Sequence, residues 1–474
     1  MTVSSTPAAT SSPAPASPSS GSSASPVSPA SGSPSSGSPS SGSSSSGSSS
    51  GAREAVDAQR WPDVAAVPRC SAARAAVAAF LVRRAMERLP LRVVLAGGSG
   101  GGRELGLGGP LMRVHDPRAF FRRIGSDGLI GFGESYMAGE WDADDLTGVL
   151  TVFAEHVAVL VPPSLQRLRA LWARRRPEAQ RNTREGARDN IRRHYDLSND
   201  LFALFLDETM TYSSAVFRGF PADEDLLPAA QHRKIDLLLD AAGVGPGTRL
   251  LEIGTGWGEL AVRAAERGAR VVSVTLSREQ RALAVERVRA AGLQDRVQVL
   301  LRDYRDVEGV YDAVISVEMI EAVGHEFWPA YFRTLQARLA PGGRIALQAI
   351  TMPHDRMLVS LPTFTWIHKY VFPGGMIPSV EAIAEICAHG TGNGTGLRIV
   401  SAEAFGPHYA ETLRLWRERF TRRAAEVGAL GFDEVFRRLW TFYLAYSEAG
   451  FRSGYLDVRQ FVLESGTAAT GSGG

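Results

Sequence analysis

The sequence predicts an α/β fold in which a doubly wound, mostly parallel sheet with helical lid insertions follows a smaller amino-terminal α+β domain. Between residues 234 and 350, short apolar runs alternate with segments of helical periodicity, which is typical of a parallel sheet covered on both faces. A glycine loop, Gly254–Gly258, directly follows one apolar run and precedes a helical pattern. In sheets of this kind, ligands bind at such strand ends.

Each predicted element rests on its apolar period and on the residues that bound it. In the amino-terminal domain we expect a helix over 72–88 and strands over 91–95 and 111–115. In the larger domain we expect strands over 249–253, 271–275, 297–302, 311–316 and 344–350, and helices over 234–242, 259–267, 277–291 and 328–339. Beyond residue 350 the alternation weakens, and amphipathic helices are expected over 410–423 and 432–451.

Composition sets the domain boundaries. The first fifty residues are almost entirely Ser, Pro, Gly and Ala, which bury too little apolar surface to offset the entropy of ordering. We therefore expect a disordered tail over 1–58, an amino-terminal domain over 59–171, an arginine-rich linker over 172–192, the α/β domain over 193–465 and a second disordered tail over 466–474.

Charge and cysteine content exclude several classes of protein. The formal net charge is +2, so bulk charge does not favour a nucleic-acid partner. Only two cysteines occur, and the nine histidines show no zinc spacing, so we expect no metal and a reducing compartment. The sequence shows neither a secretory signal nor an uninterrupted apolar span. We therefore expect a cytoplasmic protein that associates peripherally with membranes.

Arginines crowd the segment from Arg167 to Arg193, where only Glu178, Glu185 and Asp189 are acidic. An anionic phospholipid surface attracts such a patch, with about 1 kcal/mol for each cation near the surface. A solvated linker helix is the alternative interpretation.

The glycine loop indicates the class of ligand. Its glycines recur at every second position, Gly254, Gly256 and Gly258, whereas the dinucleotide fingerprint that holds a pyrophosphate is G-x-G-x-x-G. Glycine lets the backbone turn sharply and approach a ligand closely. The acid Glu252 stands just before the loop. Together these features favour S-adenosylmethionine, which carries a sulfonium and a carboxylate but no phosphate, over NAD.

The segment from Arg193 to Phe217 resembles the entry segment of the cyclopropane-fatty-acyl-phospholipid synthase family. Further stretches agree in order, at 275–280, 303–306, 316–324, 370–375 and 405–409, so the resemblance covers about 190–463. It implies the Rossmann-like fold of class I methyltransferases, S-adenosylmethionine as cofactor and a lipid-associated amino-terminal domain. The stretch from Leu347 to Asp355 is similar to the actinobacterial branch linked to tuberculostearic acid, which methylates oleoyl chains in mid-chain.

The loop and the resemblance together imply a cofactor site. Its expected residues are Tyr212, Ser213, Glu252, Gly254, Gly256, Gly258, Thr275, Gln280, Tyr304 and Arg305. Thr275 stands where many methyltransferases carry an acid for the ribose hydroxyls, and by resemblance Gln280 takes that role.

The resemblance also implies a catalytic site. In the resembling enzymes a bound bicarbonate removes the last proton, and a Cys, a Glu, a His, a Tyr and the backbone of an Ile hold it. Glu321, Tyr409 and Ile350 match this pattern, but the Cys is Ser214 and the His is Gln348. Gln348 cannot titrate near neutral pH as histidine does. Whether the product is a cyclopropane or a methylene branch therefore stays open, and the similarity to the tuberculostearic branch favours the methylene.

We therefore expect S-adenosylmethionine-dependent transfer to the cis double bond of unsaturated acyl chains, in oleoyl phospholipid at a membrane surface. Two alternatives remain: a small-molecule O- or N-methyltransferase, and an inactive lipid-binding homologue, which the changes at Ser214 and Gln348 would suit. The aromatic-rich stretch over 362–378 is interpreted as a lid or an acyl-chain tunnel, with ordinary packing on the sheet as the alternative. A reductase partner and a homodimer stay open as well.

Overall fold

A computed structural model describes residues 56–97, 102–156, 177, 180–183, 186–187, 198–388 and 395–466 of the chain. All of them belong to one compact unit that begins at Arg53. Nearly all of the two predicted tails and most of the arginine-rich segment lie outside the described residues. Of the arginines between Arg167 and Arg193, only Arg181 is described.

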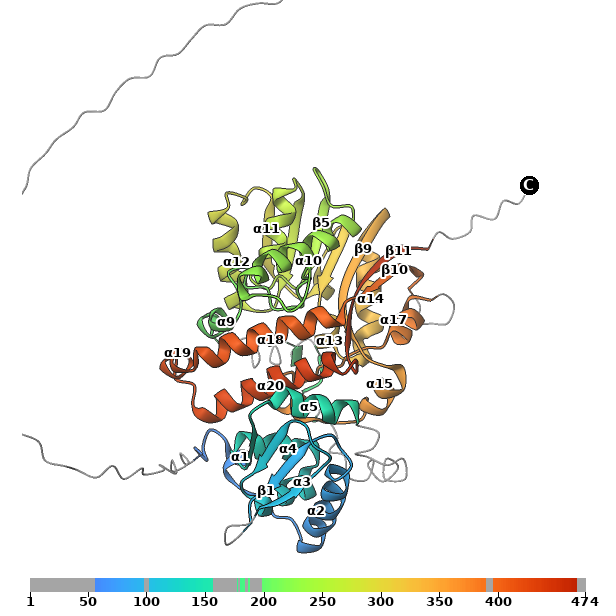
Figure 1. Ribbon diagram of the computed structural model, residues 1–474. Coiled ribbons are helices and arrows are strands. Elements are labelled where there is room, and N and C mark those ends of the chain that lie inside the picture. The colour runs from blue at the N-terminus through green and yellow to red at the C-terminus, as the bar shows by residue number, and fades with distance from the viewer. Residues whose placement is uncertain are drawn as a thin grey trace, which may run out of the picture. The chain divides into compact units, whose positions relative to one another are not determined.

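The amino-terminal domain is a small sheet packed against helices (Figure 1). Its strands are β1 (Arg92–Leu95), β2 (Arg103–Leu105), β3 (Leu111–Val114) and β4 (Trp141–Ala143), in the order β2-β1-β3-β4. Its helices are α1 (Pro62–Ala65), α2 (Ala72–Met86), α3 (Pro117–Asp127), α4 (Leu129–Met137) and α5 (Leu146–Glu155). The helix and the two strands predicted here are confirmed by α2, β1 and β3.

The second sheet has seven strands in the order β10-β11-β9-β8-β5-β6-β7. Five of them are parallel: β5 (Arg249–Ile253), β6 (Arg270–Thr275), β7 (Val297–Leu301), β8 (Tyr311–Val317) and β9 (Leu339–Thr351). The strands β10 (Leu397–Ala404) and β11 (Asp457–Ser465) join antiparallel at one edge. The predicted doubly wound, mostly parallel sheet is confirmed.

Helices cover both faces of this sheet because side chains alternate between its faces along each strand. On one face Leu250 packs with α10 (Leu227–Ala241), α11 (Glu259–Glu266) and α12 (Arg278–Ala290). On the other face Leu251 packs with α13 (Ile320–Val323), α14 (Trp328–Arg338) and α17 (Val380–Cys387). The remaining helices are α9 (Asn199–Phe205), α15 (His354–Ser360), α16 (Trp366–Tyr370), α18 (Gly406–Arg422), α19 (Ala424–Ala429) and α20 (Glu434–Arg452).

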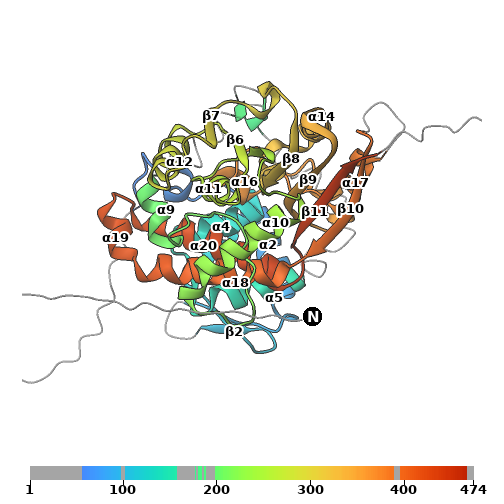
Figure 2. The ribbon, with the colours of Figure 1, turned by 90° about the horizontal axis from the view of Figure 1, so that it is seen from above.

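Helices α18 and α20 lie between the large sheet and the amino-terminal domain (Figure 1), and in the view from above they overlap helices of both parts (Figure 2). They confirm the two predicted amphipathic helices. The Arg438 guanidinium on α20 donates to the backbone oxygens of Tyr136 (2.6 Å) and Trp141 (2.9 Å). Side chains of both predicted domains therefore share one hydrophobic core, from Val64 to Val458. Among the described residues, no helix is both long and apolar enough to cross a bilayer.

The last two strands were not predicted. Strand β10 lies at the sheet edge and is mostly half-buried or exposed, so its side chains show no continuous apolar run. Strand β11 is largely buried between β10 and β9, and it begins shortly after α20 ends at Arg452. Both strands pair antiparallel, which the alternation of helices and strands upstream does not indicate.

Candidate active site

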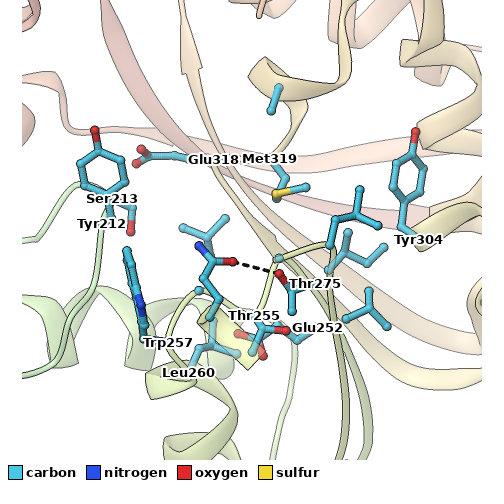
Figure 3. A pocket seen from close by; sticks show the side chains of 18 of the residues that line it. Tyr212, Ser213, Glu252, Thr255, Trp257, Leu260, Thr275, Tyr304, Glu318 and Met319 are labelled. Carbon is cyan, nitrogen blue, oxygen red and sulfur yellow. Dashed lines mark hydrogen bonds between the residues drawn. The ribbon is translucent and has the colours of Figure 1, made fainter. Parts of the chain in front are cut away.

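The order of the strands reverses at β5, which pairs with β6 on one side and β8 on the other. Loops that leave neighbouring parallel strands there form a crevice at one edge of the sheet. The glycine loop follows β5, Thr275 ends β6 and Glu318 follows β8. These segments line one pocket (Figure 3).

The pocket is lined by all of the predicted cofactor residues except Gly258. Those residues are Tyr212, Ser213, Glu252, Gly254, Gly256, Thr275, Gln280, Tyr304 and Arg305. Further lining residues that the sequence did not single out as cofactor contacts include Lys234, Asp303, Glu318 and Met319.

The three glycines of the loop differ in what surrounds them, although all have positive φ angles. A Cβ on Gly254 would lie 2.5 Å from Met319 Cγ, and one on Gly258 would lie 3.0 Å from Ala284 Cβ. A Cβ on Gly256 would meet no protein atom within 4 Å. Gly254 and Gly258 are therefore required for packing, whereas Gly256 leaves open space at the pocket wall.

Two buried titratable side chains, an amine and a carboxyl group, face the pocket. Lys234 Nζ donates to Ser213 Oγ at 2.6 Å, and Ser273 Oγ donates to Glu252 at 2.5 Å. Burial lowers the pKa of Lys234 to about 8, although nearby carboxylates, Glu318 first among them, oppose the shift. Burial raises the pKa of Glu252 to about 8, against the hydrogen bond from Ser273 and the charge of Lys234. Each group therefore favours a ligand or neighbour of the opposite charge.

The ends of β6 and β7 hold the remaining polar lining in place. Thr275 Oγ1 donates to Gln280 Oε1 at 2.9 Å, which is the dashed line in Figure 3. The Arg305 guanidinium binds both carboxylate oxygens of Asp303, at 2.8 and 2.6 Å, and lies 5.5 Å from the Tyr304 ring centre. The Thr275–Gln280 contact keeps these two predicted residues together on one wall.

The side chain of Glu318 accepts hydrogen bonds from three of the predicted catalytic residues, which are Ser214, Gln348 and Tyr409. Ser214 N (2.9 Å) and Gln348 Nε2 (2.8 Å) donate to Glu318 Oε1, and Tyr409 OH donates to Oε2 at 2.6 Å. Gln460 Nε2 donates to Gln348 Oε1 at 3.1 Å, which orients the amide so that its nitrogen faces Glu318. Burial raises the pKa of Glu318, and the hydrogen bonds from Tyr409, Ser214 and Gln348 oppose the shift.

Glu321 lies apart from this group. Its Oε1 accepts a hydrogen bond from Ile350 N at 2.5 Å, and its buried Oε2 has no hydrogen-bond partner in the described part of the chain. Burial, together with the negative charge of Glu318, raises the pKa of Glu321 to about 8. The structure thus pairs Glu321 with Ile350 and gathers the other three predicted catalytic residues around Glu318.

Sequence reasoning placed Glu318 at a strand end but gave it no role, and it gave none to Lys234. Glu318 directly follows β8, so its position at the end of a strand was the available signal. For Lys234 the signal was its rarity, since the chain contains lysine only at Lys234 and Lys369.

Aromatic rings surround the Glu318 side of the pocket. Tyr212 stacks on Trp416 with ring centres 5.3 Å apart, and its hydroxyl lies 2.6 Å from that of Tyr443. Tyr409 stacks on Phe451 at 4.5 Å. Of the aromatic-rich stretch over 362–378, Phe372 contacts Tyr443 at 5.6 Å, edge to face. No group of three or more His, Cys, Asp or Glu side chains suited to a metal ion occurs among the described residues.

Comparison with known proteins identifies relatives over most of the chain. Residues 182–461 match the family model of mycolic acid cyclopropane synthetase. The chain is 58% identical over 415 residues to a tuberculostearic acid methyltransferase of Mycobacterium tuberculosis, covering 86% of this chain and 96% of that protein. It is 34% identical over 365 residues to the cyclopropane-fatty-acyl-phospholipid synthase of Escherichia coli, covering 75% of this chain and 88% of that protein.

Solved structures show the same likeness. A cyclopropane synthase from Mycobacterium tuberculosis is 35% identical with a TM-score of 0.53, and the match covers 58% of this chain and 97% of that one. A mycolic acid cyclopropane synthase complexed with SAH and CTAB is 32% identical with a TM-score of 0.53, and the match covers 61% of this chain and 98% of that one.

Proposed function

Since the chain belongs to the mycolic acid cyclopropane synthetase family and is an S-adenosylmethionine-dependent transferase, we propose that it acts on the cis double bond of unsaturated fatty acyl chains. Every residue that lines the pocket lies within the matched range 182–461. The observation that carries the proposal is the aromatic wall. Tyr212 lines the pocket and also stacks on Trp416, so the cofactor pocket borders a cluster of aromatic rings, beside which an alkyl chain would meet apolar surface.

The pocket fits S-adenosylmethionine. The open space at Gly256 lets a ligand approach the backbone. Lys234 and Glu252 place an amine and a carboxyl group at the pocket wall, and a bound ligand that carries a carboxylate, an ammonium and a sulfonium would favour the charged form of each. We assign its contacts to the predicted lining residues, with Gly258 as a packing residue. Bound there, S-adenosylmethionine supplies an electrophilic methyl group.

The aromatic wall suits the reaction of an alkene. An isolated double bond is a weak nucleophile and must be held in line in a dry site, where positioning is worth several kcal/mol. Attack leaves a carbocation on the neighbouring carbon, and a facing ring such as Tyr212 or Tyr409 stabilises it by about 0.5–2 kcal/mol. A base must then remove a proton. A bound bicarbonate or a carboxylate of the chain itself can serve.

We propose oleoyl phospholipid as the substrate and a methylene branch as the product. The relative that is 58% identical is named for tuberculostearic acid, and the match to it covers 86% of this chain. We further propose that the amino-terminal domain, 59–171, and the arginine-rich segment bring the enzyme to the surface of an anionic bilayer. A reductase that saturates the branch and a homodimer remain part of this proposal without a contact that supports either.

The two alternatives make different demands on the site. A small-molecule O- or N-methyltransferase has no use for the cluster of aromatic rings around Tyr212 and Tyr409. An inactive lipid-binding homologue has no use for Lys234, Glu252 and the glycine loop, which are all arranged around the pocket. Both features together favour alkene methylation.

The experiment uses S-adenosylmethionine with a fully deuterated methyl group, vesicles that contain oleoyl phospholipid, and mass spectrometry of the released fatty acids. Transfer to an alkene, followed by proton loss from the new methyl group, leaves two of its three deuterium atoms in the product. Transfer to oxygen or nitrogen leaves all three. The deuterium NMR spectrum then distinguishes a methylene branch, with vinylic deuterium, from a cyclopropane, with ring deuterium. Absence of any labelled acyl product would refute the proposal.

A further inference from the structure

The carboxylate of Glu318 is held by hydrogen bonds from several parts of the chain. It accepts three hydrogen bonds, from Ser214 N, Gln348 Nε2 and Tyr409 OH, which come from distant segments of the chain. An ionised carboxylate has about four acceptor positions. Oε1 uses two of them and Oε2 uses one, so one position on Oε2 stays available to a proton. Glu318 also lines the pocket (Figure 3).

The backbone at Glu318 is strained. Its φ is +49°, a left-handed conformation that is uncommon outside glycine and costs about 1–3 kcal/mol. Glu318 N is held by Gln348 O of the neighbouring strand at 2.8 Å. Such strain persists only where surrounding contacts enforce it, and it concentrates at functional sites. Here it turns the carboxylate toward Tyr409 and the pocket.

A bound bicarbonate does not fit the same residues. Its expected donors are already engaged: the Ser214 hydroxyl donates to Ala215 O, Gln348 Nε2 and Tyr409 OH donate to Glu318, and the Ile350 N–H donates to Glu321. An anion beside the Glu318 carboxylate would add like charge in a buried site. The charged groups that face Glu318 are Lys234 and Glu321, with Tyr409 bonded to it.

We propose that the Glu318 carboxylate is the base of the reaction and takes the place of a diffusible anion, so that the enzyme needs no bicarbonate. The inference rests on the proposed function, because it concerns the proton that alkene methylation releases. Gln348 and Tyr409 are positioning residues in this scheme: they hold the carboxylate in line through its two oxygens.

The step balances without a further reactant. The π electrons of the alkene form the new C–C bond to the methyl group, and the electrons of the broken S–C bond remain on sulfur. Glu318 Oε2 then takes one proton from the methyl carbon. The electrons of that C–H bond close a cyclopropane, or form a C=C bond if a hydride has first moved to the adjacent cation. The proton passes to solvent when the products leave.

The test compares the parent enzyme, Glu318→Gln and Glu318→Gly in degassed buffer free of bicarbonate. We expect the parent to keep its full rate there and Glu318→Gln to lose about a hundredfold or more, the usual contribution of a positioned base. In Glu318→Gly the strain is relieved and the three donors face a space that a small carboxylate can fill. Added formate or bicarbonate should therefore restore its activity while leaving the parent unchanged. The exposed Glu286→Gln on α12 serves as a control that should keep the parent's rate.

Calorimetric binding of S-adenosylhomocysteine shows whether each variant retains a folded pocket. The proposal is overturned if the parent loses activity without bicarbonate, if Glu318→Gln keeps the parent's rate, or if Glu318→Gly binds the cofactor product but is not rescued by either anion. Failure of the proposed function would look different, since the parent itself would then form no labelled acyl product under any of these conditions.

Discussion

Replacement of Gly256 by leucine should abolish cofactor binding with only a modest loss of stability. Gly256 has φ +51°, lines the pocket and has no protein atom within 4 Å of a built Cβ. A leucine at this position lowers the free energy of unfolding by about 1–2 kcal/mol, because the backbone there is left-handed, but its Cβ meets no protein atom. Its side chain instead fills the space that the ligand needs, so affinity for S-adenosylhomocysteine should fall at least tenfold, or about 1.4 kcal/mol.

A matched control separates strain from occlusion. Gly243 also has a positive φ, +69°, and open space around a built Cβ, but it does not line the pocket. Gly243→Leu should therefore lose about as much unfolding free energy as Gly256→Leu and bind the ligand normally. Urea unfolding measures the first quantity and titration calorimetry the second. Unchanged affinity in Gly256→Leu, or an equal loss of affinity in Gly243→Leu, would refute the assignment of the pocket.

Three further predictions follow from the same geometry. The pKa of Glu321 is raised from 4.5 to about 8 by burial and by Glu318, so the folded state keeps a proton that the unfolded chain has lost, and stability falls as the pH rises through this window. The Glu321→Gln variant cannot ionise at this position, although Glu318, Tyr331 and Tyr409 still face it. Its unfolding free energy, measured with urea, should therefore rise relative to that of the parent as the pH increases from 5 to 8. A difference between the two proteins that does not change with pH would contradict this. Gln348→His should stay active and raise the cyclopropane share of the product measured by NMR; an unchanged product ratio would exclude this role for Gln348. Binding to anionic vesicles, measured by sedimentation, should weaken steeply from low to high salt. The Arg181→Gln variant should bind the vesicles almost as well as the parent, because Arg181 pairs with Glu326 at 3.0 Å. Binding that does not depend on salt would show that the arginine segment is not part of the docking surface.

Local patterns in the sequence were enough for most of the fold. The apolar runs from Arg249 to Thr351 alternate with helices at short spacing, so both the type of each element and the parallel pairing could be predicted before any contact was known. Strands β10 and β11 were missed because edge position and antiparallel pairing decide them. The sequence also did not predict that the two domains share one hydrophobic core. The periodicity of α18 and α20 indicates an apolar face on each helix but not what that face packs against.

The sequence by itself determined the cofactor class and most of the residues of the pocket wall. The glycine loop and Thr275 lie at the ends of predicted strands, and Gln280 lies at the start of the helix that follows Thr275. Only the tertiary structure decided which carboxylate the catalytic residues surround. Glu318 and Glu321 are three residues apart, one directly after β8 and the other in α13, and no periodicity distinguishes them. The left-handed turn at Glu318 and the meeting of Ser214, Gln348 and Tyr409 from three distant segments make the distinction, and both depend on long-range packing that local sequence does not encode.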